Sequence, residues 1–315
     1  MPHLALSTAF ALIAMPKVWA QPGQETASAN RDFTLYANTD LLVLNIGVQD
    51  SHGANARGLA ARDFKIFENG SLQPIKQFSS EERPVTVGIV VDASGSMRAR
   101  QAQVAAAALS FVKASNPDDE MFVVNFNDRA QLGLPDDTPF TDDPKTIGMA
   151  LLGKRPEGKT ALYDAVALAL NQIRKGKWEK KALLLISDGG DNNSTHTYRE
   201  ILQAIEESGV TIHTIGLFDD DDPDQNPGVL RRLSNTSGGE AFLPMDHSEI
   251  DSICRRIAAD IRASYTLAYT PPHPDQHTAI RKIKIVVTNP AGGKMTVHAR
   301  ASYVLSAVKD LQPHD

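Results

Sequence analysis

The chain has 315 residues, of which 42% are hydrophobic and 22% are charged, and its formal net charge is -6 at pH 7. A chain of this length and composition can bury one large core or two smaller ones without covalent staples. The acidic balance excludes the basic surface that a phosphate backbone requires, so we expect no nucleic-acid partner.

The first twenty residues have the shape of a secretory signal peptide. The apolar stretch at residues 4–15 is too short to span a bilayer, although no Lys or Arg precedes it. Small residues at Val18 and Ala20 predict cleavage between Ala20 and Gln21, and a glutamine at that point indicates no lipid anchor. We expect no transmembrane span in the mature chain and a secreted or periplasmic location.

A polar linker at residues 21–30 leads into a β-rich segment at residues 31–83. Alternating or apolar patterns predict strands at residues 33–36, 41–48, 64–70 and 74–78. Asn69-Gly70 falls between the last two of these strands and is the strongest short-range signal for a hairpin.

Strands and helices alternate over residues 84–263. Apolar runs predict strands at residues 85–91, 121–126, 130–134, 182–186, 210–217 and 241–243. Helices are predicted at residues 98–115, 161–174, 198–207, 229–233 and 248–263. This alternation indicates a doubly wound α/β fold, with a mostly parallel sheet that helices cover on both faces.

The chain returns to β structure after residue 263, with strands predicted at residues 265–269, 280–288 and 294–303. Neither end has enough strands for a core of its own. We therefore expect residues 264–305 to pack with residues 31–83 in a small β-sandwich, followed by a tail at residues 306–315.

Cysteine and histidine carry no recognisable site pattern. The single cysteine, Cys254, lies at helical spacing with Ile250, Ile253 and Ile257, which indicates a core thiol rather than a nucleophile. The nine histidines lack metal-ligand spacing and are interpreted as surface or packing residues.

Oxygen-bearing side chains follow several of the predicted strands. Asp92, Ser94 and Ser96 form an Asp-x-Ser-x-Ser pattern after the first buried strand of the α/β segment. Thr160 stands at the start of a predicted helix, and Asp188 follows another buried strand. Helix capping or turn formation would explain any one of these residues. Their shared position at the strand ends where α/β sheets bind ligands favours a metal site.

These motifs resemble the von Willebrand factor A domains and the integrin inserted domains, with their metal-ion-dependent adhesion site, over about residues 84–263. The resemblance implies that Ser94, Ser96 and Thr160 are hydroxyl ligands and that Asp92 and Asp188 act mainly through bound water. The implied ion is Mg²⁺, with Mn²⁺ or Ca²⁺ as alternatives, since these hard cations prefer oxygen ligands. The implied partner is a protein that supplies a Glu or Asp carboxylate.

The flanking segments also resemble a bacterial subfamily of von Willebrand factor-related proteins described from Acidobacteria. The motifs concerned are Asp63-Phe64-Lys65 and Glu68-Asn69-Gly70 before the α/β segment, and residues 265–272 after it. This resemblance implies no defined reaction.

Other polar residues near these motifs have more than one interpretation. Asp164 is either a residue that supports the metal ligands or an ordinary first-turn acid. Asp191 and Asn192 are interpreted as turn residues. The acidic loop from Asp219 to Asp224 is interpreted as a solvated loop on the same rim, with a Ca²⁺ site or a charge filter as alternatives.

The sequence thus predicts a secreted or periplasmic, non-enzymatic protein that binds a protein partner through Mg²⁺. One alternative is an assembly subunit of a larger envelope complex. A metal-dependent hydrolase is less favoured, because the sequence shows no second metal cluster, no phosphate-binding loop and no general base tied to a nucleophile.

Overall fold

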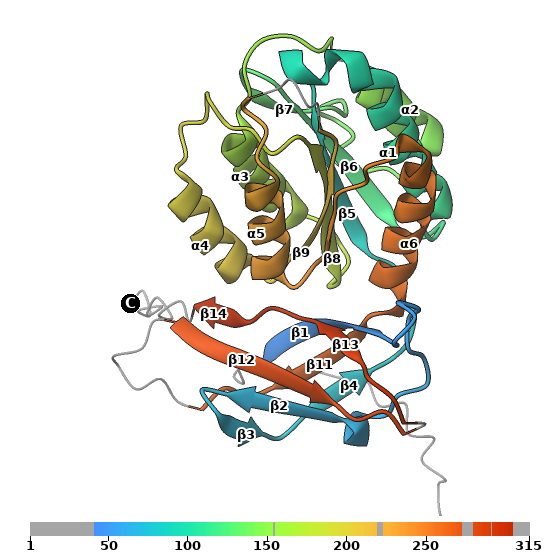
Figure 1. Ribbon diagram of the computed structural model, residues 1–315, viewed down its shortest axis with the longest axis vertical. Coiled ribbons are helices and arrows are strands. Elements are labelled where there is room, and N and C mark those ends of the chain that lie inside the picture. The colour runs from blue at the N-terminus through green and yellow to red at the C-terminus, as the bar shows by residue number, and fades with distance from the viewer. Residues whose placement is uncertain (1–40, 154, 219–222, 273–279, 291, 305–315) are drawn as a thin grey trace, which may run out of the picture. The chain divides into compact units, whose positions relative to one another are not determined.

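The computed structural model describes residues 41–153, 155–218, 223–272, 280–290 and 292–304 (Figure 1). The predicted signal peptide, the linker, the first predicted strand and the tail at residues 306–315 lie outside these described residues. Within them, no helix is both long and apolar enough to cross a bilayer.

A mostly parallel sheet of six strands forms the centre of the α/β segment, in the order β10-β9-β8-β5-β6-β7. Its strands are β5 (Thr86–Asp92), β6 (Glu120–Phe126), β7 (Ala130–Leu132), β8 (Lys181–Ser187), β9 (Thr211–Gly216) and β10 (Ala241–Phe242). Among the described strands of this sheet, β7 alone runs antiparallel to its neighbour. Every residue of β5 and β6 is buried, as the continuous apolar runs predict.

Helices lie on both faces of this sheet (Figure 1). One face carries α1 (Gln101–Ala114), α2 (Pro144–Leu152) and α6 (Ile250–Ala263), and the other carries α3 (Leu162–Ile173), α4 (Tyr198–Ser208) and α5 (Pro227–Ser237). The predicted doubly wound fold is therefore confirmed. Cys254 on α6 is fully buried, and burial raises the pKa of its thiol to about 12, which confirms a core role.

Helix α2 is absent from the sequence-based prediction. Its start nevertheless carries a local signal, because the Asp143 side chain accepts hydrogen bonds from the amides of Lys145 and Thr146 and Pro144 occupies the first turn. The helix is only nine residues long, so its apolar repeat is too short to stand out. Another difference lies before α1, where Gly95–Arg100 form a 3₁₀ helix instead of an α-helical turn.

Strands from both ends of the chain form two four-stranded sheets, in the orders β13-β1-β11-β4 and β14-β12-β2-β3. Their strands are β1 (Leu42–Gln49), β2 (Phe64–Glu68), β3 (Ser71–Gln73), β4 (Gln77–Ser79), β11 (Tyr265–Tyr269), β12 (Ile280–Val287), β13 (Thr296–His298) and β14 (Ser302–Val304). Leu44 and Leu267 from the first sheet share one hydrophobic cluster with Ile66 and Ile283 from the second. This cluster is distinct from the core of the α/β segment.

The Asn69-Gly70 hairpin returns into a different strand from the one predicted. Both residues have positive φ, 47° and 86°, as a two-residue hairpin turn of this type requires. Such a tight turn pairs β2 at once with β3. The strand predicted at residues 74–78 instead contributes β4, which pairs with β11 in the other sheet. Likewise, the strand predicted at residues 294–303 is two strands, β13 and β14, in different sheets.

Candidate metal site

The predicted site residues gather at the carboxyl ends of β5 and β8. Asp92 is the last residue of β5, and Asp188 directly follows β8. These strands are hydrogen-bonded parallel neighbours, so their ends meet at one edge of the sheet. Thr160 lies in the loop before α3. Helix α3 packs against β5 and β6.

Hydrogen bonds join four of the five predicted residues into one chain. The Oγ atoms of Ser94 and Ser96 lie 3.1 Å apart, and Ser96 Oγ donates to Asp188 Oδ2 at 2.6 Å. The backbone amide of Ser94 donates to Asp92 Oδ1 at 2.9 Å. Ser187, which the sequence-based prediction omits, donates through Oγ to Asp92 Oδ2 at 2.6 Å.

The fifth residue, Thr160, lines a small hollow of about 100 Å³ together with Ser96 and Asp188. The remaining lining residues are Gly158, Gly190, Asn192 and Asp224. Asp92 and Ser94 do not line the hollow; both are almost fully buried and connect to it through Ser96.

The electrostatics of the site are dominated by the carboxylates of Asp92 and Asp188. Burial and the negative charge of Asp188 together raise the pKa of Asp92 to about 7, although hydrogen bonds from Ser187 and Ser94 oppose the change. A divalent cation beside these groups would offset the repulsion between them. The site therefore fits a cation electrostatically.

The donor set also fits a hard divalent cation chemically. It consists of two carboxylates and three hydroxyls, all oxygen donors of the kind that Mg²⁺ prefers. Across the described part of the chain, no group of three or more His, Cys, Asp or Glu residues could hold a metal ion. A cation held here would depend on the hydroxyl oxygens.

Two glycines after β8 allow a second loop to approach the site. Gly189 has a φ of +82°, and a Cβ atom there would lie 2.3 Å from the carbonyl oxygen of Asn226. A Cβ atom on Gly190 would lie 2.9 Å from the carbonyl oxygen of Asp224. The Asn226 amide donates to the Asp188 carbonyl at 2.9 Å. Side chains at these glycines would displace the backbone of Asn226 and of Asp224, and Asp224 lines the hollow.

Asn192 holds Thr160 in place. Asn192 Oδ1 accepts a hydrogen bond from the Thr160 amide at 2.9 Å, and the Asn192 amide donates to the Thr160 carbonyl, also at 2.9 Å. Asn192 Nδ2 donates to Asp224 Oδ2 at 3.2 Å. Asn192 is thus more than the turn residue that the sequence predicts, because its side chain connects two loops of the site.

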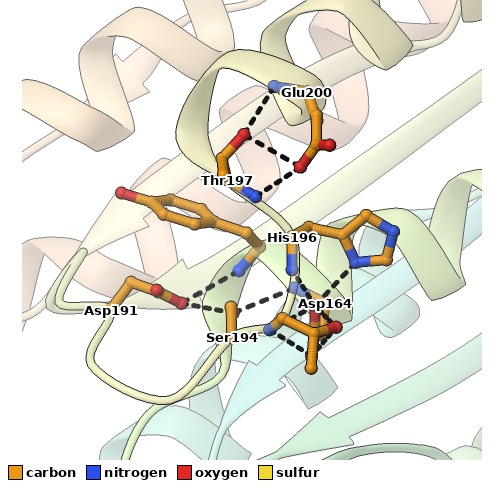
Figure 2. A network of polar contacts seen from close by, with 8 residues as sticks. Asp164, Asp191, Ser194, His196, Thr197 and Glu200 are labelled. Atoms are coloured by element: carbon orange, nitrogen blue, oxygen red, sulfur yellow. Dashed lines mark hydrogen bonds and ion pairs between the residues drawn. The ribbon is translucent and has the colours of Figure 1, made fainter.

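Asp164 fixes the loop that carries Asn192 (Figure 2). Its carboxylate accepts hydrogen bonds from the amides of Thr195 at 3.0 Å and His196 at 2.9 Å, and it contacts His196 Nδ1 at 2.6 Å. Burial opposes its ionisation, but these hydrogen bonds outweigh burial and hold the pKa of Asp164 below its ordinary value. Asp164 does not line the hollow; its carboxylate contacts the loop after β8 instead.

Asp191 fixes the same loop from its other end (Figure 2). Asp191 Oδ1 accepts hydrogen bonds from the Tyr163 amide at 3.2 Å and from the hydroxyl of Ser194. Asp191 therefore acts within its turn, through Ser194, and also connects that turn to the start of α3, through Tyr163. In the acidic loop, residues 219–222 lie outside the described residues, whereas Asp224 lines the hollow, on the rim where the sequence places it.

Comparison with known proteins relates the α/β segment to a family. Residues 87–190 match the family model of the von Willebrand factor type A domain. The uncharacterized protein sll0103 of Synechocystis sp. is 25% identical over 169 residues, which are 53% of this chain and 39% of that protein. The chain thus spans about two fifths of the length of this curated relative.

Solved structures show the same fold. The von Willebrand factor type A protein from Catenulispora acidiphila aligns with a TM-score of 0.51 and 14% identity, covering 84% of this chain and 75% of that chain. Proximal thread matrix protein 1 from the mussel byssus aligns with a TM-score of 0.50 and 18% identity, covering 62% and 51%. Residues 87–190 therefore belong to a von Willebrand factor type A domain, and the α/β segment has the fold of such domains.

Proposed function

We propose that this chain is a non-enzymatic protein that binds a protein partner through a divalent cation at the candidate metal site. The observation that carries this proposal is the chain of hydrogen-bonded oxygen atoms from Ser94 through Ser96 to Asp188, which ends in a hollow that Thr160 also lines.

In this proposal the cation is Mg²⁺, held by the hydroxyls of Ser94, Ser96 and Thr160, with Asp92 and Asp188 acting through bound water. Because neutral hydroxyls supply the direct contacts, the bound ion offers a site for an outside oxygen, here a Glu or Asp carboxylate of the partner. The chain's own residues then hold the ion in the hollow, where the partner carboxylate can reach it.

Binding is favoured over catalysis by the residues around the hollow. Its described lining consists of Ser, Thr, Gly, Asn and Asp, without a His, Lys or Cys to exchange protons near neutral pH or attack a substrate. Asp188 is engaged with Ser96 and with the Gly190 amide. These contacts suit a residue that holds a fixed geometry.

The proposal includes a secreted or periplasmic location, which rests on the predicted signal peptide at residues 1–20. It also includes the division into a von Willebrand factor type A domain at residues 84–263 and a β module from residues 31–83 and 264–305. The antiparallel pairing of β1 with β11, and of β2 with β12, supports one module built from both ends of the chain.

Mn²⁺ titration of the purified protein, followed by electron paramagnetic resonance, tests the cation site. We expect binding by the wild type and loss of binding in Asp92→Ala, with the circular dichroism spectrum unchanged. Asp143→Ala removes an exposed carboxylate at the start of α2 and serves as the matched control. Equal binding by the wild type and Asp92→Ala would overturn the proposal.

Capture of partners tests the docking function. Immobilised protein is incubated with envelope extract of the source cells in Mg²⁺ or in EDTA. A partner retained in Mg²⁺ alone, and lost with Asp92→Ala, supports docking. Turnover of phosphate or ester substrates that disappears in Asp188→Ala would instead indicate a hydrolase.

A further inference from the structure

The hollow has one wall that none of the predicted metal ligands supplies. Asp224, in the segment after β9, lines the hollow together with Ser96, Thr160 and Asp188. Its backbone lies against Gly190, where a Cβ atom would come within 2.9 Å of the Asp224 carbonyl oxygen. Close packing at a glycine keeps this segment beside the site.

The side chain of Asp224 is held as well as its backbone. Asn192 Nδ2 donates to Asp224 Oδ2 at 3.2 Å. Asn192 is itself fixed, because it exchanges two hydrogen bonds of 2.9 Å with the backbone of Thr160. The carboxylate of Asp224 therefore has a defined position relative to the hydroxyl-bearing side of the hollow.

This arrangement concentrates negative charge around the hollow. Its described lining carries the carboxylates of Asp188 and Asp224 and neither Lys nor Arg. A cation bound beside Asp188 is balanced in part by that residue and by Asp92, whereas Asp224 adds a further negative charge on the rim. A second anionic group from a partner would be repelled there, and a cationic group would be attracted.

We infer that Asp224 is a specificity-determining residue, which selects a partner carboxylate that stands next to a Lys or Arg over one surrounded by other acids. Asn192 is its positioning residue. This inference rests on the proposed function and names the class of partner that the same site accepts.

Two variants separate the charge of Asp224 from its structural contacts. Asp224→Asn removes the charge and keeps an oxygen that can accept from Asn192 Nδ2. The double variant Asn192→Asp/Asp224→Asn moves the charge to residue 192, reverses the donor and acceptor of that hydrogen bond, and leaves an oxygen for the Thr160 amide. Its total charge equals that of the wild type.

The test selects random heptapeptides displayed on phage against each immobilised protein in Mg²⁺, with elution by EDTA. We expect wild-type eluates to contain Asp or Glu next to Lys or Arg about three times as often as Asp224→Asn eluates. Peptides eluted from Asp224→Asn keep the Asp or Glu, and a basic neighbour becomes less frequent. The double variant recovers the basic neighbour. Mn²⁺ affinity falls about threefold in Asp224→Asn, because one negative charge near the ion is lost in a solvated site. It recovers in the double variant, which restores that charge at residue 192.

Three other results would overturn the proposed role of Asp224. Equal basic enrichment in wild type and Asp224→Asn overturns the role of Asp224 and leaves docking intact. Loss of all EDTA-eluted peptides and of Mn²⁺ binding in Asp224→Asn makes Asp224 part of the cation site itself and also overturns the inference. If wild type binds Mn²⁺ but yields no EDTA-eluted peptide, docking through the cation fails, and the inference fails with it.

Discussion

Asp92 combines a proposed functional role with an unfavourable effect on folding. Asp92 is 2% exposed, and its carboxylate is repelled by that of Asp188. Burying a carboxylate beside another one destabilises the fold, because the charged form loses hydration and meets a like charge. Hydrogen bonds from Ser187 and Ser94 offset part of this effect.

Replacing Asp92 with asparagine should therefore separate function from stability. Asp92→Asn keeps the side-chain shape and an oxygen for the Ser94 amide, and it removes the buried charge. We expect Mn²⁺ affinity to fall at least about tenfold, while the free energy of unfolding in EDTA at pH 8 rises by about 1 kcal/mol. Urea unfolding and Mn²⁺ titration measure the two effects. A variant that is destabilised in EDTA would contradict the prediction.

At the scale of elements, the loop after β8 links α3 to the hollow. Asp164 on α3 accepts hydrogen bonds from Thr195 and His196, and the same loop carries Asn192, which holds Thr160. Because Asp164 holds this loop, it also helps to hold Thr160, one of the proposed hydroxyl ligands, in position. Support of this kind is typical of groups that orient metal ligands without touching the metal.

Removing that support should weaken cation binding without abolishing it. In Asp164→Ala the amides of Thr195 and His196 lose their acceptor, so we expect faster amide hydrogen exchange at both residues and Mn²⁺ affinity reduced about tenfold. The control, Asp143→Ala, also removes a carboxylate that accepts two backbone amides, at the start of α2. Its Mn²⁺ affinity should stay at the wild-type value, and an equal loss in both variants would refute the loop's role.

Helix α6 provides a pH-dependent contribution to stability. Burial raises the pKa of Asp260 to about 6, and the hydrogen bond from Asn55 Nδ2, at 2.7 Å, opposes the change. A folded-state pKa above the unfolded value of 3.8 means that the folded state binds the proton more tightly. The charged carboxylate therefore destabilises the fold fully above pH 6, and this effect disappears as the pH falls towards 4.

The corresponding variant is Asp260→Asn, which can still accept from Asn55. We expect the gain in stability of this variant over the wild type to be about 2 kcal/mol larger at pH 7.5 than at pH 4.5, because a shift of one pKa unit corresponds to about 1.4 kcal/mol. Urea unfolding at both pH values measures this difference. A difference between the two proteins that does not change with pH would show that Asp260 is solvated.

At the scale of the whole molecule, a buried polar cluster joins segments from both sides of the von Willebrand factor type A domain. Glu68 on β2 is 2% exposed and accepts hydrogen bonds from the hydroxyls of Tyr269 at 2.6 Å and Tyr303 at 2.9 Å. It also forms an ion pair with the guanidinium of Arg281. The partners come from β11, β12 and β14, so the cluster connects the chain before the domain with the chain after it.

Neutralising Glu68 should destabilise the molecule strongly. In Glu68→Gln the buried guanidinium of Arg281 loses its counter-charge, and we expect the free energy of unfolding to fall by about 3 kcal/mol. Glu81→Gln, which removes an exposed partner of Arg83, is the control and should change stability little. Thermal unfolding compares them. If both variants unfold at the wild-type temperature, the cluster contributes no net stability.

Local patterns in the sequence were sufficient for most elements of the α/β segment and for placing Asp92 and Asp188 at the ends of buried strands. β5, β6 and β8 are largely apolar runs. A run of this kind indicates a strand that is buried on both faces, and it does so without information on the neighbouring strands. Asp92 and Asp188 were predictable because strand ends at one edge of a parallel sheet collect ligand-binding side chains. Such signals lie within one element and need no knowledge of its neighbours.

The tertiary structure decided which distant residues meet. Ser96 reaches Asp188 across 92 positions of the chain, and Asn192 reaches Thr160 across 32. The same holds for β4, which pairs with β11 in the other sheet instead of closing the hairpin after Asn69-Gly70. Periodicity reports only on neighbours within a strand or a helical turn. The sequence placed the loop of Asp224 on this rim, but the contact between Asn192 and Asp224 across the hollow was decided only by the packing of their loops.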